Sequence, residues 1–291
     1  YDAEWVEPIG LDYRGYRVWE IPPNGQGLNA LMALNIVQCL EIDAASAAET
    51  VHRQIEAMKL AFADGLHYIA DPRHMRVGVH ELLSEAYARE RSKLITENAS
   101  TPAPGRPKSG GTVYLAAADR EGNMVSFIQS NYRGFGSGVV VPGTGIALHN
   151  RGSDFSLHPE DANALAPGKK PYHTIIPGFL TKDGRPIGPF GVMGAYMQPQ
   201  GHLQLMMNIL DFNMNPQAAL DAPRWMWVRD RTVRLEPHFP REIADVLVRK
   251  GHKIEYADDI GFGRGQMIWR TPEGVLLGAT DPRADGMVAA W

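Results

Sequence analysis

The chain has 291 residues, of which 44% are hydrophobic and 21% are charged, and its formal net charge is −4. This composition is typical of a globular protein with one large or two modest domains, and the mild negative charge gives no electrostatic basis for binding nucleic acid. The sequence contains no run of about 18 apolar residues, the pattern that would predict a membrane span. The single cysteine, Cys39, excludes an internal disulfide and a cysteine-built zinc site.

The first third of the chain favours helices. GYRVWEIP (15–22) alternates like a strand, and the segments 27–42, 46–71 and 81–95 have helical patterns. Segment 27–42 is apolar around much of its circumference, so we expect it to be buried, whereas the apolar residues of 46–71 recur every three or four positions. The opening YDAEWVEPIG is no signal peptide, so we expect a piece of a longer product, and it assigns no compartment.

After residue 112 the pattern changes to short β-runs with a few helices between them. We expect helices near 200–212, 216–222 and 240–251. The helices of the first third and the hairpins that follow predict an α+β fold, with helices packed on sheet. The expected strands are 112–118, 124–130, 138–141, 145–149, 174–181, 187–193, 232–238, 253–258, 266–270 and 275–280.

The motif KSGGTVYL (108–115) joins a Pro/Gly/Ser-rich stretch, 101–111, to the first of these strands. Gly-Gly is ordinarily a turn and Thr is a common strand residue, so these residues alone favour a purely structural role.

The turn Asp119–Asn123 makes this motif more informative, because it predicts a hairpin. If Ala118 pairs with Met124, the antiparallel register places Thr112 opposite Ser130. Cross-strand Thr–Ser pairs are commonly only structural. Two hydroxyls beside a Gly-Gly peptide are also what an N-terminal-nucleophile enzyme needs, because there the Thr hydroxyl attacks the preceding carbonyl. Hydrolysis of the resulting ester then frees an N-terminal Thr, whose amine serves as the base.

Eight pieces spread over nearly the whole chain form a specific combination: GYRVWEIPPNGQG, AFADGLHYIADP, GGTVYLAAADREGNMVSFIQS, FGSGVVVPGTGIALHNRGSDFS, NALAPGKKPYHTIIP, GPFGVMGAYMQPQGH, NPQAALDAPRW and GATDPRADGMVAA. In these pieces and in their order, the chain resembles the γ-glutamyltranspeptidase-like family of N-terminal-nucleophile hydrolases. The resemblance implies a proenzyme that cuts itself between Gly111 and Thr112. Residues 1–111 would be the C-terminal part of the large subunit and 112–291 the small subunit, together forming one composite domain. The resemblance also implies a four-layer αββα sandwich with two central antiparallel sheets.

The resemblance also implies roles for the reacting groups. Thr112 would be the nucleophile and its freed amine the base, while Ser130 would supply the second hydroxyl. Gly194 and Ala195 stand where the family usually has Gly-Gly, whose N–H groups form the oxyanion hole. Each such donor contributes about 2.7–4 kcal/mol to lowering the barrier. Ala195 can still donate its N–H if its backbone conformation tolerates a Cβ.

The substrate-binding positions depart from the transpeptidase pattern. Asp154 matches the carboxylate that receives the glutamyl amino group, but Tyr132 and Arg151 replace polar amide residues near it. His173 and Thr174 replace the serine pair that holds the substrate carboxylate, and the family's arginine for that carboxylate would lie upstream of this chain. These departures argue against strict glutamyl specificity. With MQPQGH (197–202) after the predicted oxyanion stretch, the chain resembles the branch labelled cephalosporin acylase or γ-glutamyltransferase, and oxamate amidohydrolase belongs to the same neighbourhood.

Several of these residues also have structural interpretations. Asp154 either binds the substrate, the role we favour, or merely closes a loop turn. Arg151 could be a surface charge, a salt-bridge partner or a bidentate ligand for an acyl carboxylate. His173 is equally consistent with substrate contact and with a structural role. Structural roles are favoured for His149, for His202 and for the Trp225–Trp227 cluster, while Tyr196 shapes the pocket or forms its wall.

Together these features predict an autoprocessing amidohydrolase or acyltransferase that cleaves γ-glutamyl or related carboxylate-bearing amides and passes the acyl group to water or an amine. The alternatives are a specialised acylase for glutaryl- or oxamate-type amides, and a catalytically silent or truncated scaffold. The histidines show no ligand spacing and the glycine motifs do not complete a nucleotide fingerprint, so we expect no metal and no cofactor. The expected partners are a small-molecule substrate and the upstream part of the large subunit, in a homodimer or heterotetramer.

Overall fold

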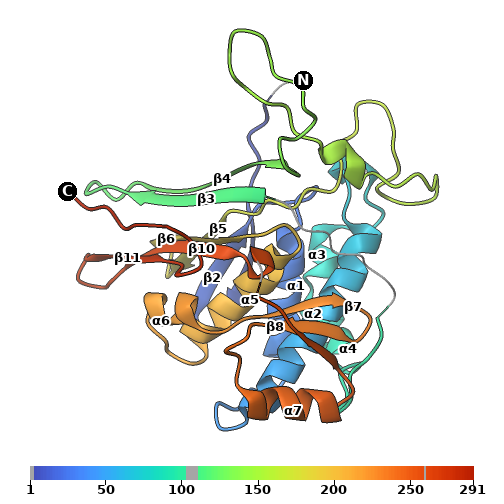
Figure 1. Cartoon of the computed structure of the whole chain (residues 1–291), viewed down its shortest axis with the longest axis vertical. Helices are drawn as coiled ribbons and strands as arrows, with labels where there is room; N and C mark the ends of the chain where they lie inside the picture. Colours follow the sequence, from blue (N-terminus) through green and yellow to red (C-terminus); the bar gives the residue numbers. More distant parts are fainter. Residues whose placement is uncertain (1–2, 103–110, 259) are drawn as a thin grey trace.

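The computed structural model describes residues 3–102, 111–258 and 260–291. Lys108, Ser109 and Gly110 of the KSGGTVYL motif therefore lie outside the described residues. The helices and strands form stacked layers, with the longer helices packed beneath an antiparallel sheet and a β-hairpin lying above it (Figure 1).

The main sheet has six strands in the order β1-β2-β5-β6-β10-β11, and every neighbouring pair is antiparallel. It joins both halves of the chain, because β2 pairs with β5 through Val18 opposite Leu180. The strands are β1 (Ile9–Tyr13), β2 (Tyr16–Glu20), β5 (Gly178–Lys182), β6 (Arg185–Met193), β10 (Arg264–Arg270) and β11 (Leu276–Thr280).

Helices cover one face of this sheet. α1 (Gly27–Gln38) packs on β1 and β2, and α5 (Met197–Leu210) packs on β6. Leu28, Leu31 and Leu34 of α1 are wholly buried, as the apolar circumference of this segment predicts. Each buried leucine stabilises the fold by about 1.5–3 kcal/mol. α2 (Ala47–Tyr68) packs beside α1, and the short helices are α3 (Val79–Leu82), α4 (Glu85–Ser92) and α6 (Pro216–Asp221).

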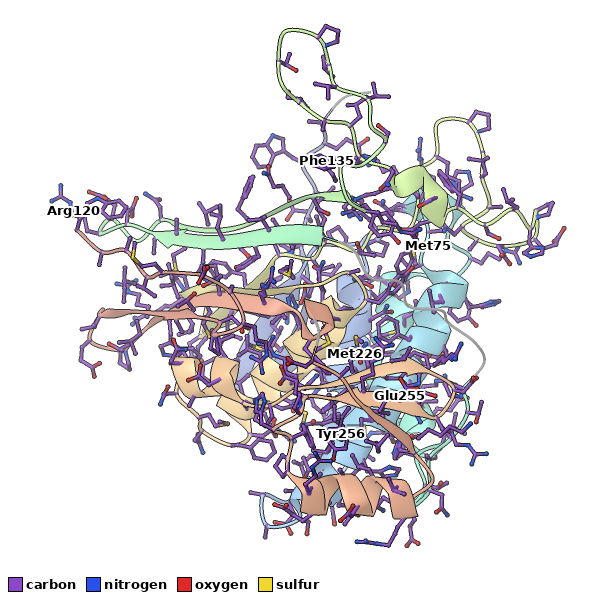
Figure 2. All side chains as sticks on the ribbon, viewed as in Figure 1. Met75, Arg120, Phe135, Met226, Glu255 and Tyr256 are labelled. Carbon is purple, nitrogen blue, oxygen red and sulfur yellow. The ribbon has the colours of Figure 1, made fainter. Side chains whose placement is uncertain are left out.

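The hairpin of β3 (Gly111–Ala118) and β4 (Met124–Tyr132) packs on the opposite face, where β3 contacts β6 and β10. Its turn extends to the edge of the molecule, where Arg120 lies (Figure 2). Its outward face carries four exposed apolar side chains, Val113, Leu115, Val125 and Phe127. No helix in the described part of the chain covers that face (Figure 1). The described residues therefore form three layers of the expected sandwich: helices, sheet and hairpin.

A smaller sheet packs against α2 through its first strand. It consists of β7 (Trp225–Arg229), β8 (Thr232–Leu235) and β9 (Lys253–Tyr256), and α7 (Arg241–Arg249) packs against α2 and β9. β8 and β9 are parallel, connected through α7. The expected core position of the Trp cluster is confirmed for Trp225 and Trp227, which are both buried.

Several predicted elements were wrong. The segments 138–141 and 145–149 are not strands, although they face each other across an isolated bridge between Val140 and Ala147 and two backbone hydrogen bonds beside it. Gly143 and Gly145 adopt left-handed conformations that turn the chain between them. The predicted helix 81–95 is two short helices with Ser84 between them, whose side chain accepts a hydrogen bond from the N–H of Tyr87. The strands β1 and β7 were not predicted. Among the described residues, no helix is both long and apolar enough to cross a bilayer.

Candidate active site

The hairpin brings the two predicted hydroxyls together. Val113 pairs with Gln129 and Ala118 with Met124, which confirms the predicted register, and a bulge follows between Val113 and Gly111. Thr112 is 8% exposed, and its hydroxyl donates a 3.2 Å hydrogen bond to the Oγ of Ser130. The Thr112 side chain thus lies on the inner face of the hairpin, toward the main sheet, beside a second hydroxyl.

Tyr132 connects this pair to the predicted substrate pocket. Its N–H donates to the Ser130 Oγ at 2.8 Å, and its own hydroxyl donates to Oδ1 of Asp154 at 2.7 Å. Tyr132 has a φ of 75°, a strained conformation for a residue with a side chain. Burial, together with the hydrogen bond to Asp154, raises the pKa of Tyr132 to about 12, so its hydroxyl stays protonated as a donor.

Gly194 and Ala195 form a tight turn between β6 and α5. Their φ angles are 135° and 50°, so the Cβ of Ala195 is accommodated at a cost of roughly 1–2 kcal/mol. Neither backbone N–H has a hydrogen-bond acceptor among the described residues. Buried N–H groups are almost always paired, and this turn directly precedes the positive end of the helix dipole of α5. Two unpaired donors there are suited to stabilise a developing oxyanion.

Gln26 holds this turn in place, and we did not predict it. Its Nε2 donates to the carbonyls of Thr174 at 2.7 Å and of Ala195 at 2.8 Å. Its Oε1 accepts from the hydroxyl of Tyr172 at 3.2 Å, and Tyr172 stacks on Tyr196. Gln26 lies within the piece GYRVWEIPPNGQG, but nothing in the sequence pattern indicates contacts more than 140 residues away.

The remaining predicted binding residues are Arg151, His173 and Thr174, and Arg151 contacts both Tyr132 and Thr174. Arg151 lies in the short 3-10 helix η2 (Arg151–Asp154) and donates through Nη1 to Oγ1 of the buried Thr174 at 2.9 Å. Its guanidinium also lies over the ring of Tyr132, 5.0 Å from the centroid. Burial and the charge of Arg151 lower the pKa of His173 to about 3, so that imidazole is neutral at pH 7. The interpretation of Arg151 as a surface charge was therefore wrong.

Two further histidines, His202 and His149, make hydrogen bonds that stabilise the fold. Nε2 of His202 accepts from the N–H of Val192 at 3.1 Å, and its Nδ1 lies 2.6 Å from Oε1 of the buried Glu20. His149 accepts at Nδ1 from the N–H of Arg151. These three contacts fit the structural roles that the sequence favoured for His202 and His149.

The structure also gathers three buried groups able to ligate a metal, His52, Glu56 and His252. The histidines are 200 residues apart in sequence, so the spacing could not predict this cluster. Nζ of Lys59 lies 2.6 Å from Oε1 of Glu56, so a cation already neutralises the carboxylate. We therefore assign no metal to these residues.

The fold is that of an N-terminal-nucleophile hydrolase: a threonine at the start of a strand lies in a hairpin that packs on an antiparallel sheet backed by helices. The family model for gamma-glutamyltranspeptidase matches residues 1–291. The chain belongs to this family.

The chain is 38% identical to the glutathione hydrolase-like YwrD proenzyme of Bacillus subtilis (98% of this chain, 56% of the relative). It is also 38% identical to the oxamate amidohydrolase proenzyme of Klebsiella pneumoniae (98% and 55%). The crystal structure of cephalosporin acylase from Bacillus halodurans superimposes with a TM-score of 0.95 at 66% identity (100% and 54%). The chain thus spans about half the length of the relatives it matches.

Proposed function

We propose that the chain is the catalytic part of an autoprocessing N-terminal-threonine amidohydrolase or acyltransferase. The observation that carries this is the position of Thr112, whose hydroxyl contacts Ser130 at the start of β3. The names of the relatives, several of them proenzymes, support the same chemistry. Residues 1–111 and 112–291 would be the large-subunit and small-subunit parts of one composite domain. The main sheet, in which β2 of the first part pairs with β5 of the second, supports a single composite domain.

Maturation would begin when the Thr112 hydroxyl attacks the carbonyl carbon of Gly111. The amide bond to the Thr112 nitrogen breaks as the ester to its oxygen forms. Water then hydrolyses the ester and leaves a carboxylate on Gly111 and a free α-amine on Thr112. An α-amine with a pKa of about 8 is suited to take the proton from its own hydroxyl.

In turnover, Thr112 would attack the substrate amide and form a tetrahedral intermediate. The N–H groups of Gly194 and Ala195 would donate to its oxyanion, and the Thr112 amine would pass its proton to the departing amine. The acyl-enzyme ester would then be attacked by water or by an amine acceptor. Ser130 would hold the Thr112 hydroxyl in position through the cycle.

The substrates would be γ-glutamyl or related carboxylate-bearing amides. A specialised acylase for glutaryl- or oxamate-type amides is the second candidate, because Tyr132 hydrogen-bonds Asp154 and a buried Arg151 lies beside them. Measuring turnover of γ-glutamyl and glutaryl anilides distinguishes these two candidate functions. Inactivity on both anilides would contradict both candidate functions.

The first test is the intact mass of the purified protein beside a Thr112→Ala control. Two pieces that separate between Gly111 and Thr112 in the parent alone would support the proposed nucleophile. The measurement is made on the full-length natural precursor. A single uncut chain after long incubation would indicate a silent scaffold and contradict the proposal.

A further inference from the structure

A pocket lies on the helical side of the main sheet, whereas the hairpin that carries Thr112 packs on the opposite face (Figure 1). It is formed by α2, the C-terminal half of α5 and the N-terminus of α7, and its volume is about 230 Å³. An apolar cavity of about 150 Å³ already takes up benzene. This pocket therefore has room for an aromatic ring with a short substituent.

The wall of the pocket is mostly apolar. Trp225 and Phe239, which line it, are 1% and 4% exposed, and Val51 of α2 and Ile243 of α7 complete the same wall. Among the described residues that line it, Asp43 alone is charged. A mostly apolar wall with a few polar groups is typical of a small-molecule site.

Gln54 places an unpaired donor in this wall. The residue is 4% exposed, and its Oε1 accepts a 3.1 Å hydrogen bond from Nε1 of Trp225. This bond fixes the orientation of the amide, because an indole N–H can only donate. Nε2 of Gln54 then has no acceptor in the described part of the chain. Buried amide N–H groups are normally paired, so this one indicates a ligand that carries an acceptor.

Asp43 gives the mouth of the pocket a negative charge. Its carboxylate accepts hydrogen bonds from the turn that precedes α2, and it forms no ion pair within the described ranges. Two basic residues of the flanking helices are already engaged: Arg53 pairs with Glu49, and Arg241 lies over the ring of Tyr256. The C-terminal, negative end of the α5 dipole is also directed toward this region. These charges favour an ammonium group at the mouth and disfavour a carboxylate.

The acidic and amide groups are spaced for one small molecule. The hydroxyl of Thr50 donates to the carbonyl of Asp43 at 3.1 Å, and Gln54 lies four residues further along α2. Four residues of α-helix span about 6 Å. A ligand that is one aromatic ring and a short chain in length therefore reaches both groups.

We propose that this pocket binds a small aromatic amine, with its ring against Trp225 and Phe239, an acceptor atom on Nε2 of Gln54 and its ammonium group at Asp43. The proposal does not depend on the chemistry of Thr112. Because α2 precedes the predicted cleavage point and α5, β7 and α7 follow it, the two parts of the chain share the pocket. An occupant therefore stabilises the contact between the two parts.

Calorimetry on the full-length protein at pH 7 tests this proposal with three matched phenols: tyramine is a cation, 4-ethylphenol is neutral and 4-hydroxyphenylacetate is an anion. Tyramine should bind with a Kd of about 0.1–1 mM, the range expected for about ten non-hydrogen atoms. It should bind at least about 3-fold more tightly than 4-ethylphenol and at least about 10-fold more tightly than the anion. Tyramine, but not the anion, should also raise the midpoint of thermal unfolding.

Three variants locate the binding site. Asp43→Asn should remove the preference for tyramine over 4-ethylphenol, whereas Glu41→Gln, the matched control, removes a charge from the same loop outside the pocket and should keep it. Ala47→Leu should weaken tyramine by at least about 5-fold, because Ala47 is exposed at the mouth and a longer side chain fills it.

Four results would overturn the proposal, whether or not the protein cuts itself at Gly111. They are no binding of tyramine at about 10 mM, equal affinities for tyramine and 4-ethylphenol, equal effects of Asp43→Asn and Glu41→Gln, and unchanged tyramine binding in Ala47→Leu.

Discussion

Replacing Gln26 with Leu should impair catalysis more than substrate binding. The change removes hydrogen bonds of 2.7 and 2.8 Å to the carbonyls of Thr174 and Ala195, together with the 3.2 Å bond from the Tyr172 hydroxyl. The Ala195 carbonyl keeps a 3.2 Å bond from the N–H of Gln198, whereas the buried Thr174 carbonyl loses its side-chain donor. An unsatisfied carbonyl costs about 1–3 kcal/mol and each further lost bond about 0.5–1.5 kcal/mol, so the free energy of unfolding should fall by about 2–5 kcal/mol. Because the Ala195 carbonyl belongs to the turn that presents the two unpaired N–H groups, kcat should fall by about 10- to 100-fold.

The assay combines urea denaturation with steady-state kinetics on the best anilide at saturation. Gln38→Leu is the control, since Gln38 is half-buried at the end of α1 and its amide makes, among the described residues, a single 3.4 Å hydrogen bond, to Oδ1 of Asn35. That variant should change stability by no more than about 0.5 kcal/mol. A Gln26→Leu protein that is destabilised but retains the parental kcat would refute the argument, because Gln26 would then be structural and not a positioning residue.

Three further predictions follow from the contacts described above. Ala195→Gly should keep kcat within about twofold, because glycine relieves the strain of the left-handed backbone and retains the N–H. Ala195→Val should lower kcat at least about 10-fold, because a β-branched residue tolerates that conformation poorly. Equal kcat values for the two variants would contradict this prediction. Asp281→Ala should lower the free energy of unfolding by about 3–5 kcal/mol in urea denaturation, because Nη2 of the buried Arg224 lies 2.6 Å from Oδ2 of Asp281 and would lose this carboxylate. A loss below about 1 kcal/mol would contradict this prediction. Burial and the nearby charge of Lys59 lower the pKa of His252 to about 3, whereas an unfolded histidine takes up its proton near pH 6.5. Stability is therefore fully present above about pH 6.5 and falls by about 1.4 kcal/mol per pH unit as the pH drops toward 3. His252→Asn should reduce the loss between pH 7 and 5 by about 2 kcal/mol, and identical losses in both proteins would exclude this origin.

The sequence predicted best what depends on neighbours along the chain. The turn Asp119–Asn123 set the hairpin register, so the contact between Thr112 and Ser130 was predictable without the structure. The helix predicted over 27–42 from its apolar surface is present over Gly27–Gln38 and ends four residues before the predicted boundary. The roles of Thr112 and Ser130 in catalysis remain predictions.

The contacts that shape the site were not predictable, because they join distant segments. Gln26 reaches Ala195 across 169 residues, and its amide shows no pattern in sequence. The strand β7 was missed because WMWVR is apolar at successive positions, so its alternation is hidden. The burial of Arg151 depends on packing against Tyr132 and Thr174, which no local rule describes.

The alternation of β3 separates two properties along one strand. Thr112 and Tyr114 point inward, and Val113 and Leu115 point outward together with Val125 and Phe127 of β4. A contiguous apolar face of this kind promotes self-association in water. The outward side chains of β3, Val113 and Leu115, are therefore expected to promote self-association, whereas the Thr112 side chain next to Val113 is buried. Polar substitutions at Val113 and Leu115 should reduce that association while leaving the side chain of the proposed nucleophile unchanged.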